Sequence, residues 1–486
     1  MTVASADIAE GEQLERIPTG IPELDLVLRG GVGKGRVHLV EGRPGTGKTT
    51  MATQFLVAGR DRGLRGLYVA LSETAEELAA SAASHGWHLK GIEVLELAPE
   101  QSRRGLDQSI LEPSELDLGE TIDQIVDAVA HTQATLVVID SLAEVRLLAT
   151  EPNRYRRQIM ALRRQLLQSG ATVLLLNDMT EGGDYDLQAM VHCVVSLQMT
   201  ERSYGAARRR LRVVKMRGGD FQSGWHDFVI QRGQLIVFPS LIAQEHETGH
   251  PREVQSCGSA ELDALFGGGL SRGSTTVLTG PSGVGKSTLA MQLLQAAARG
   301  GQRSAYFSFD EAQASAQERA EHLGFDFNAL VASGAMHWER ANPTRISPGE
   351  FVWKVRRQVE DNGASMVVID SLNSYLETMP EEQALMLQLH ELLTYLSHQG
   401  VVTLMVLAER GVVEPLESPI DLSFLSDAVV LMRYHEAGHD LRRTITVIKN
   451  RTGRHSSRAH AFTLARGGLH IGDAMQADLA ATLPAC

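Results

Sequence analysis

The chain repeats itself, and this internal duplication constrains its fold more than any other feature. Residues 19–49 read TGIPELDLVLRGGVGKGRVHLVEGRPGTGKT, and residues 257–287 read CGSAELDALFGGGLSRGSTTVLTGPSGVGKS. Later residues keep nearly the same separation, which is 238, 230 and 234 positions for the pairs Lys48 and Lys286, Asp140 and Asp370, and Lys215 and Lys449. A repeat of this length is a whole domain rather than a solenoid unit. The sequence therefore predicts two copies of one domain.

Short apolar segments alternate with helical patterns in each half. The first half contains VHLVEG, GLYVAL, ATLVVID and ATVLLLN, and the second contains TTVLTG, SAYFSF, SMVVID and VVTLMVL. Such continuous, β-branched runs are typical of a parallel sheet covered on both faces. We expect an α/β fold in each half, with a mostly parallel twisted sheet flanked by helices. The expected boundaries are 14–238 and 254–473 for the domains, 239–253 for a polar linker and 474–486 for a short tail.

Composition excludes several classes of protein from the candidates for this chain. The formal charge of −13 gives no basic footprint for DNA or an anionic membrane, so neither is an expected partner. Cys193, Cys257 and Cys486 are too few and scattered for a disulfide framework or a metal cluster, and they fit a reducing cytoplasm. No apolar run approaches the roughly 18 residues that span a bilayer, and the first residues do not resemble a secretory signal. We expect a cytoplasmic protein.

Two glycine-rich loops, GRPGTGKT at 42–49 and GPSGVGKS at 280–287, match the phosphate-binding pattern G-x-x-x-x-G-K-[ST]. Glycines let backbone N–H groups turn inward around phosphate oxygens, and the following helix start adds its positive dipole end. Lys48 and Lys286 should reach the β- and γ-phosphates of ATP, and Thr49 and Ser287 should bind Mg²⁺. An ordinary glycine turn is the alternative, but two matches in repeat register argue against it. The remaining residues expected to contact ATP are Gly42, Gly45, Thr46, Gly47 and Thr50, and Gly280, Ser282, Gly283, Val284, Gly285 and Thr288.

Each half also has an apolar strand that ends in aspartate, LVVID at Asp140 and MVVID at Asp370. A carboxylate at the carboxyl end of a central strand faces the crevice where ligands bind in open α/β sheets. It can hold the Mg²⁺ shell. A strand-end cap is the alternative for either residue alone, but the preceding phosphate loop in both repeats favours the metal role.

Acidic residues follow the second apolar strand of each half, with Glu73 in LYVALSET and Asp310 and Glu311 in AYFSFDEA. A carboxylate here could orient or deprotonate an attacking water or hydroxyl. The alternative is an acid favoured by a helix dipole. Ser72 stands where the second half has Asp310, so the two sites are expected to be chemically unequal.

Late in each half a Lys-x-Arg pair occurs, Lys215 with Arg217 and Lys449 with Arg451. On a strand this spacing places both cations on one face. They are candidates for fingers that reach the γ-phosphate on a neighbouring subunit. A surface ion pair is the alternative. Together these motifs predict tandem RecA-like P-loop ATPase domains.

With these motifs the chain resembles the KaiC family, the bacterial circadian-clock ATPase and autokinase and its relatives. The resemblance covers roughly residues 14–472 and includes VVIDS twice, KMRGGDFQSGWHDF and DAVVLMRY. It implies a two-tiered homo-hexamer with Mg-ATP between subunits, and a cross-subunit role for the Lys-x-Arg pairs. In the family the N-terminal ring is the main ATPase and carries paired glutamates after the second strand. Here Ser72 takes one of those places and Glu73 the other.

The resemblance also implies serine autokinase activity in the C-terminal domain. The family phosphorylates an adjacent Ser and Thr just before a D-x-h-h-h-h strand, and the matching stretch here is DLSFLSDAVVLMRY. Ser423 falls on the serine position, Phe424 replaces the threonine, and Ser426 is the next hydroxyl. Asp310 stands where the family has the glutamate that activates the accepting hydroxyl. For Ser423 a loop or strand-start hydroxyl remains the alternative.

Other interpretations of the sequence predict a different activity or a different partner. After residue 473 only AMQADLAATLPAC remains, whereas the family's clock members continue into a tail that binds an activator. A KaiC-like signalling or stress ATPase with a regulatory protein partner is therefore favoured over an oscillator. A RecA- or RadA-type DNA-dependent ATPase would explain the arginine run at 206–212, but the acidic charge argues against it. A nucleotide-gated scaffold without kinase activity would explain Ser72 and Phe424.

Overall fold

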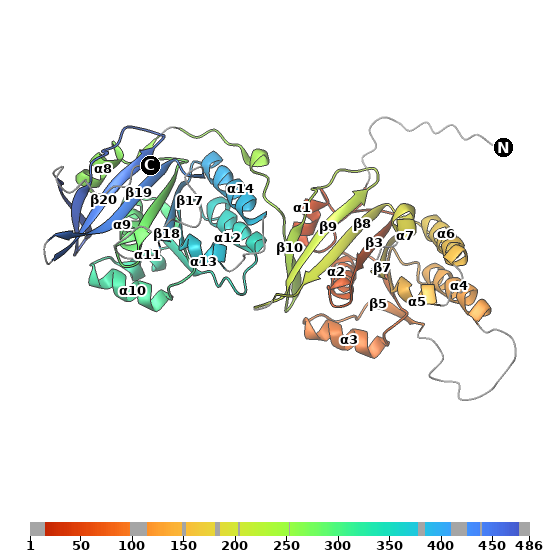
Figure 1. Cartoon of the computed structure of the whole chain (residues 1–486). Helices are drawn as coiled ribbons and strands as arrows, with labels where there is room; N and C mark the ends of the chain where they lie inside the picture. The colour runs from red at the N-terminus through yellow and green to blue at the C-terminus, as the bar shows by residue number, and fades with distance from the viewer. Residues whose placement is uncertain are drawn as a thin grey trace. The chain divides into compact units, whose positions relative to one another are not determined.

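The computed structural model describes residues 15–97, 114–147, 152–179, 185–202, 205–251, 253–377, 384–409, 425–437 and 440–475. The chain divides into two compact units, Met1–Ser240 and Leu241–Cys486, which we call unit 1 and unit 2. Each unit has its own sheet with helices against it (Figure 1). The two units are described separately below.

Unit 1 is built on a nine-stranded sheet in the order β11-β10-β9-β8-β3-β7-β6-β4-β5. The strands from β8 to β5 in this order are parallel, and β9, β10 and β11 are added antiparallel at one side. The strand bounds are β3 Val37–Gly42, β4 Gly66–Ala70, β5 Ile92–Glu96, β6 Leu136–Asp140, β7 Thr172–Asp178, β8 Cys193–Thr200, β9 Arg208–Met216, β10 His226–Gln231 and β11 Gln234–Phe238. A short pair, β1 Arg16–Ile17 and β2 Val32–Gly33, lies apart from this sheet.

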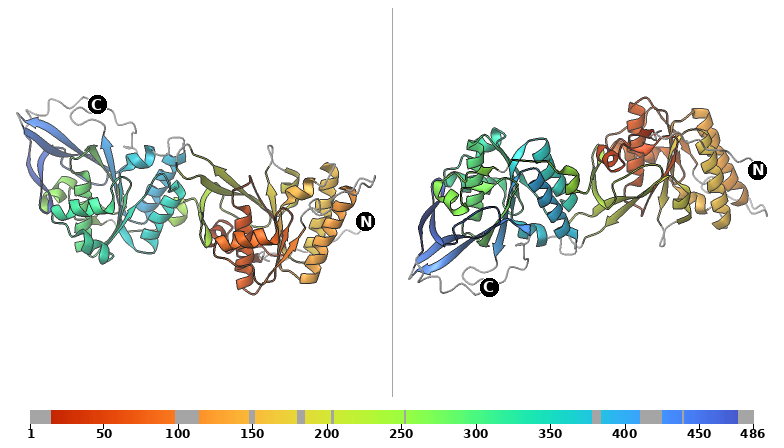
Figure 2. Two further views of the ribbon diagram at one scale, coloured as in Figure 1. Left: turned by 90° about the horizontal axis from the view of Figure 1, so that it is seen from below. Right: turned by 90° about the horizontal axis from the view of Figure 1, so that it is seen from above.

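Helices cover both faces of the unit 1 sheet, as the two views of Figure 2 also show. One face packs on α1, α2 and α3, and the other packs on α4, α5, α6 and α7. The central strand β6 presents Leu136, Val137, Val138 and Ile139 to these layers, and all four are fully buried. The helix bounds are α1 Pro22–Val27, α2 Lys48–Asp61, α3 Ala75–Ser84, α4 Ser114–Thr132, α5 Leu142–Leu147, α6 Pro152–Gln168 and α7 Tyr185–Met190.

Unit 2 repeats this architecture, with the sheet order β16-β15-β17-β18-β14-β19-β20-β21-β22. Its strands are β14 Thr275–Pro281, β15 Arg303–Ser308, β16 Met336–Arg340, β17 Ala364–Asp370, β18 Val402–Glu409, β19 Ala428–Ala437, β20 Asp440–Asn450, β21 His460–Ala465 and β22 Gly468–Ala474, with a separate pair β12 Val254–Gln255 and β13 Leu270–Ser271. Its helices are α8 Ala260–Phe266, α9 Lys286–Arg299, α10 Gln313–His322, α11 Phe327–Ala332, α12 Pro348–Glu360, α13 Leu372–Glu377 and α14 Ala384–His398. The first four cover one face and the last three the other.

The predicted fold class is confirmed in both units. The predicted apolar run at 37–42 coincides with β3, and the run at 275–280 lies within β14. Continuous burial on two faces explains why these strands read as unbroken apolar segments. Each phosphate loop leads directly into a long helix, α2 or α9, that packs on the sheet.

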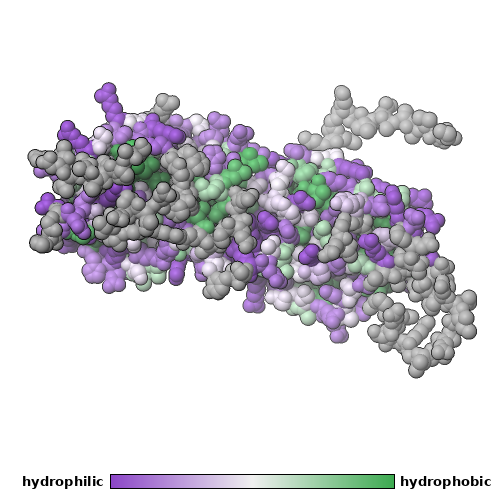
Figure 3. Space-filling model, in the orientation of Figure 1, coloured by the Kyte–Doolittle hydropathy of each residue, from purple (hydrophilic) through white to green (hydrophobic). Residues whose placement is uncertain are grey.

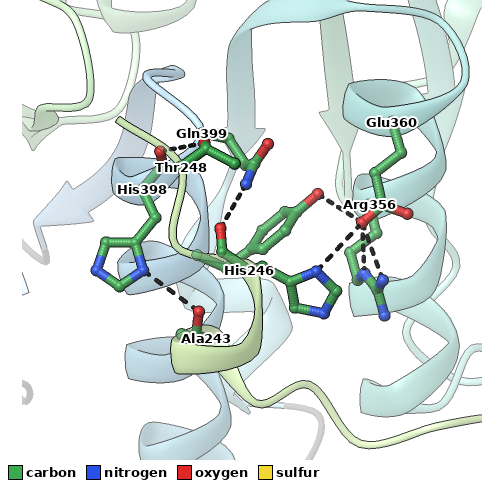
Figure 4. Close-up of polar contacts among 8 residues, drawn as sticks. Ala243, His246, Thr248, Arg356, Glu360, His398 and Gln399 are labelled. Atoms are coloured by element: carbon green, nitrogen blue, oxygen red, sulfur yellow. Dashed lines mark hydrogen bonds and ion pairs between the residues drawn. The ribbon is translucent and has the colours of Figure 1, made fainter. Parts of the chain in front are cut away.

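The start of unit 2 is held against its own helices (Figure 4). A short 3₁₀ helix, η2 Ala243–His246, contacts α14. The Ala243 amide donates to a Glu391 oxygen at 3.0 Å, and the Gln399 side-chain amide donates to the His246 carbonyl at 2.7 Å. The His246 ring points toward Glu360 on α12, with Nδ1 4.0 Å from the carboxylate. Part of the stretch predicted as a linker, 239–253, is therefore packed on unit 2.

The visible surface is mixed in polarity. Hydrophilic residues cover much of it, and hydrophobic residues gather in smaller patches, one of them where Figure 1 draws α14 (Figure 3). Leu387 on α14 is 64% exposed. Among the described residues, no helix combines the length and the apolar character that crossing a membrane requires.

Candidate functional site

Each phosphate loop links the carboxyl end of a central strand to the start of a helix. In unit 1, Gly45 and Gly47 have positive φ angles of 79° and 105°, which an L-residue rarely adopts. A Cβ at Gly47 would lie 2.6 Å from Cδ1 of Ile230, so a larger residue would also have to displace the end of that side chain. Gly283 and Gly285 repeat these angles in unit 2, at 78° and 122°. Both loops are therefore cradles with backbone N–H groups at a helix start, as phosphate binding requires.

The two loop lysines have different neighbours. The Lys48 ammonium donates to the Gly42 carbonyl at 2.9 Å and forms an ion pair with Asp178, at the end of β7, at 2.6 Å. In contrast, the Lys286 ammonium donates to the carbonyls of Gly280 and Pro281, each at 2.7 Å. Burial lowers the pKa of Lys286 to about 8, although Asp370 and Glu409 oppose that change. Both lysines lie over the loops that contain them, and their predicted contact with phosphate stays a prediction.

A hydroxyl and an aspartate come together beside each loop. The Thr49 hydroxyl donates to an Asp140 oxygen at 2.7 Å, and the Tyr68 hydroxyl donates to the same oxygen at 2.6 Å. In unit 2 the hydroxyls of Ser287 and Tyr306 donate to Asp370. Burial raises the pKa of Asp370, and these hydrogen bonds partly offset that increase. Oxygen donors at the start of a phosphate-loop helix fit Mg²⁺, which would neutralise phosphate charge when bound.

The remaining loop residues shape the cradle. The Thr46 hydroxyl donates to the Arg43 carbonyl at 2.8 Å, so it closes the loop on itself. Val284 is fully buried in the core of unit 2, and Thr288 is buried in the first turn of α9. Their predicted contribution to ATP binding would therefore come from the backbone. Thr50 and Ser282 are more exposed than these residues.

The acids that follow the neighbouring strand differ between the units. Glu73 is partly buried, and burial together with the Asp140 charge raises the pKa of its carboxyl. Asp310 accepts hydrogen bonds from the hydroxyls of Ser371, at 2.5 Å, and Ser374. Glu311 forms a two-point ion pair with Arg319 on α10, at 2.7 and 3.2 Å. The two adjacent acids of unit 2 thus face different partners.

The Lys-x-Arg pairs lie at the opposite end of the sheet from the loop of their own unit. Lys215 pairs with Val194, which also pairs with Leu39, whereas the loop begins after Gly42, the partner of Leu197. Three residues of strand separate these levels by about 10 Å. The Arg217 guanidinium donates to the Ala189 carbonyl at 2.7 Å, further from the loop.

Unit 2 repeats that placement. Lys449 pairs with Val429 near the start of β19, and its ammonium donates to the Ser426 carbonyl at 2.6 Å. Arg451 is exposed. Because β9 ends at Met216 and β20 at Asn450, each arginine follows its strand by one residue. Neither pair meets the loop of its own unit.

A β-bulge precedes each of these lysines. The register of β8 and β9 jumps between Val194 and Val195, which leaves Val214 unpaired, and the same jump leaves Ile448 unpaired in unit 2. Both bulged residues are apolar and exposed, at 38% and 55%. A bulge redirects the side chains that follow it. The bulges occupy equivalent positions in the two units, so they redirect Lys215 and Lys449 in the same way.

The two candidate phosphorylation positions are placed differently. Ser423 lies outside the described residues. Ser426 is only 1% exposed, just before β19. Phosphorylation of Ser426 would therefore require this strand start to open.

Arg209 and Arg443 are candidate site residues that the motif analysis missed. Arg209 pairs with Met199 and Phe228, and Cβ atoms placed at Gly45 and Gly47 would lie within 4 Å of those two side chains. Arg443 pairs with Tyr434, whose hydroxyl would lie 3.5 Å from a Cβ at Gly283. Both arginine Nε atoms are buried without a hydrogen-bond partner in the part of the chain that the structure describes. The signal was available, because the two arginines are separated by 234 residues, as are Lys215 and Lys449.

Arginines of the run at 206–212, which favoured a DNA-binding interpretation, contact other side chains of unit 1. Arg208 forms a two-point ion pair with Asp227 at 2.8 and 3.0 Å. The guanidinium groups of Arg210 and Arg212 lie 5.4 and 4.7 Å from the ring centre of Trp225. These three arginines therefore have partners within unit 1, which argues against the DNA-binding interpretation of the run.

Two nine-stranded sheets with identical strand order, each carrying a phosphate loop, a strand-end aspartate and a helix-start hydroxyl, define tandem RecA-like P-loop ATPase domains. A family model described as "ATPase: KaiC" matches residues 17–242 and again residues 256–476. The chain therefore belongs to the KaiC family of ATPases.

Individual relatives match over nearly the whole chain. The circadian clock protein KaiC3 of Synechocystis is 26% identical over 95% of this chain and 93% of the relative. The circadian clock protein KaiC2 of the same organism is 27% identical over 96% of this chain and 83% of the relative. The circadian clock oscillator protein KaiC of Thermostichus vulcanus is 26% identical over 96% and 90%.

Proposed function

We propose that both units bind Mg-ATP and hydrolyse it, and that the protein acts as a KaiC-like ATPase in signalling, timing or stress response. One observation carries this proposal: in each unit a glycine cradle, its lysine and a hydroxyl–aspartate pair meet at one end of the sheet. Loop amides and the lysine would hold the polyphosphate, and Thr49 with Asp140, or Ser287 with Asp370, would hold Mg²⁺.

We further propose that the chains assemble into a two-tiered homo-hexamer with a nucleotide between neighbours. The support is the position of the Lys-x-Arg pairs, which lie at the end of the sheet away from the loop of their own unit. A cation at that end of the sheet lies away from the nucleotide of its own unit. It would therefore contact the nucleotide of the neighbouring subunit more readily. Light scattering at saturating Mg-ATP should give the hexamer mass, and a monomer under these conditions would refute the assembly.

The family resemblance supports a serine autokinase in unit 2. In the proposed step the Ser423 oxygen attacks the γ-phosphorus, the bond from that phosphorus to the β,γ-bridging oxygen breaks, and ADP leaves. The serine proton passes to the Asp310 carboxylate, which already accepts two serine hydroxyls in this structure. Lys449 and Arg451 of a neighbour would stabilise the charge that develops on the transferred group.

Incubation with γ-labelled ATP separates the ATPase from the kinase. The purified chain should release labelled phosphate, and phosphopeptide mass spectrometry should find phosphate on Ser423 but none in Ser423→Ala. If the protein hydrolyses ATP but carries no label, the kinase proposal is refuted and the ATPase proposal stands. Nucleotide bound without any hydrolysis would instead favour a nucleotide-gated scaffold, the alternative that Ser72 and Phe424 support.

A further inference from the structure

In unit 2 a carboxylate and hydroxyls meet between a strand end and the helix beside it. Asp310 follows β15 by two residues, and Ser374 lies in the first turn of α13. The Ser374 hydroxyl donates to Asp310, and the Ser371 hydroxyl donates to it at 2.5 Å. Glu311 is held by Arg319 on α10 instead. Asp310 is thus the acid that contacts Ser371 and Ser374, between the end of β17 and the start of α13, whereas the charge of Glu311 acts on Asp370.

The same two positions can be located in unit 1 from the strand register. Ala70 pairs with Asp140 just as Ser308 pairs with Asp370. The next backbone contact also repeats, since the amides of Leu71 and Phe309 donate to the carbonyls of Asp140 and Asp370 at 2.7 and 2.6 Å. Residue 72 therefore corresponds to residue 310.

The helices after the metal-binding strands correspond as well. Both α5 and α13 begin two residues after the strand-end aspartate and contain six residues. Residue 144 therefore corresponds to residue 374. Unit 2 has Asp310 on the strand side and Ser374 on the helix side, whereas unit 1 has Ser72 on the strand side and Glu144 on the helix side. The carboxylate and the hydroxyl have changed places.

A glutamate on the helix can deliver its carboxylate to the same spot. From the equivalent position the much shorter Ser374 side chain already contacts the Asp310 carboxylate. Glu144 is partly buried, and its amide donates to the Ser141 carbonyl at 3.2 Å, so its backbone is fixed in the first turn. Ser72 is short and exposed.

We propose that Glu144 is a catalytic carboxylate of unit 1 and replaces the acid that Ser72 lacks. This inference rests on the proposed ATPase function of unit 1. Glu144 accepts a proton from the attacking water as the water oxygen bonds to the γ-phosphorus of ATP. The bond to the β,γ-bridging oxygen breaks, and ADP and phosphate leave. The absence of an acid at position 72 therefore does not prevent ATP hydrolysis in unit 1.

The test uses the full chain with Lys286→Ala, so that only unit 1 binds nucleotide. In this parent, Glu144→Gln should lower phosphate release about 10²-fold or more, because a positioned general base contributes at least that much. ATP binding should persist, and chromatography of bound nucleotide should show ATP in place of ADP. The matched control is Glu76→Gln, an exposed acid in the first turn of α3, which should leave both readouts within about twofold of the parent.

An exchange variant separates catalysis from a structural role. Glu144→Ser should lose hydrolysis, and Glu144→Ser combined with Ser72→Asp, which recreates the arrangement of unit 2, should recover it to within about tenfold of the parent. Full activity of Glu144→Gln, or a loss that the exchange does not restore, would overturn the inference. A parent that binds ATP but releases no phosphate would refute hydrolysis by unit 1 itself, before any change at residue 144.

Discussion

At the scale of single residues, the two phosphate-loop lysines show how one motif can have two electrostatic settings. Lys48 is paired with Asp178 at 2.6 Å, whereas Lys286 is held by two carbonyls and has a pKa of about 8. Burial removes hydration from the Lys286 ammonium, and the two carbonyls and the more distant Asp370 and Glu409 charges only partly compensate for that loss. The two sites should therefore respond differently to pH and to mutation.

We expect ATP affinity in unit 2 to fall as the pH rises through about 8. Burial holds the pKa of Lys286 below its ordinary value, so above pH 8 the nucleotide-free lysine is neutral and must take up a proton to bind phosphate. Affinity should then fall by about tenfold per pH unit, and it should stay flat below pH 7.5. Calorimetry on the Lys48→Ala variant in buffers of different ionisation enthalpy measures both the affinity and the proton uptake. Lys286→Arg, which stays charged, should bind without this dependence, and a wild-type lysine that behaves the same way would contradict the argument.

Removal of the Asp178 carboxylate should tighten nucleotide binding in unit 1. Lys48 must leave this partner to reach a phosphate, and the carboxylate repels the incoming anion. In the Lys286→Ala background, Asp178→Asn should lower the dissociation constant of ATP about fivefold, the scale of a partly exposed ion pair. Asp186→Asn, which breaks an exposed pair with Arg156, should change nothing. Unchanged or weaker binding in Asp178→Asn would mean that the pair does not compete with nucleotide.

At the scale of elements, an aromatic cluster joins α12 and α13 to the sheet of unit 2. Phe351 is fully buried, and its ring centre lies 5.5 Å from Phe307, 5.3 Å from Phe309 and 5.1 Å from Tyr375. Phe351→Ala should reduce the free energy of unfolding of unit 2 by about 3–5 kcal/mol through lost burial and a cavity. Leu387→Ala, at an exposed position on α14, should stay within about 0.5 kcal/mol. Chemical denaturation of the nucleotide-free chain compares them, and equal stability of the two variants would rule out this core assignment.

The sequence predicted the elements that are buried on two faces better than those that are not. Parallel strands such as β3 and β6 carry continuous apolar runs that local reasoning can find. The bulges at Val214 and Ile448 are set by the register with the partner strand, so no local sequence pattern predicts them. Likewise, the exchange between Ser72 and Glu144 becomes visible only when strand register and helix start are known together. The positions of the loops and of the hydroxyl–aspartate pairs beside them could therefore be predicted, and the contacts between separate elements could not.

At the scale of the whole molecule, duplication predicts two independent nucleotide sites in one chain. The wild-type chain should bind two ATP molecules at saturation, Lys48→Ala and Lys286→Ala one each, and the double variant none. Each lysine contacts the loop of its own unit, so we expect neither change to affect the other site. Bound nucleotide per chain, measured after gel filtration in Mg-ATP, tests this. Two molecules still bound to the double variant would contradict both loop assignments.

The placement of the Lys-x-Arg pairs away from their own loops has a genetic consequence. In the proposed hexamer each nucleotide depends on cations from the neighbouring subunit, so co-expressed chains lacking Lys449 and Arg451 should act as dominant negatives. Conversely, a chain without Lys286 and a chain without Lys449 should partly complement each other, because some junctions in a mixed ring would join one intact loop to one intact pair.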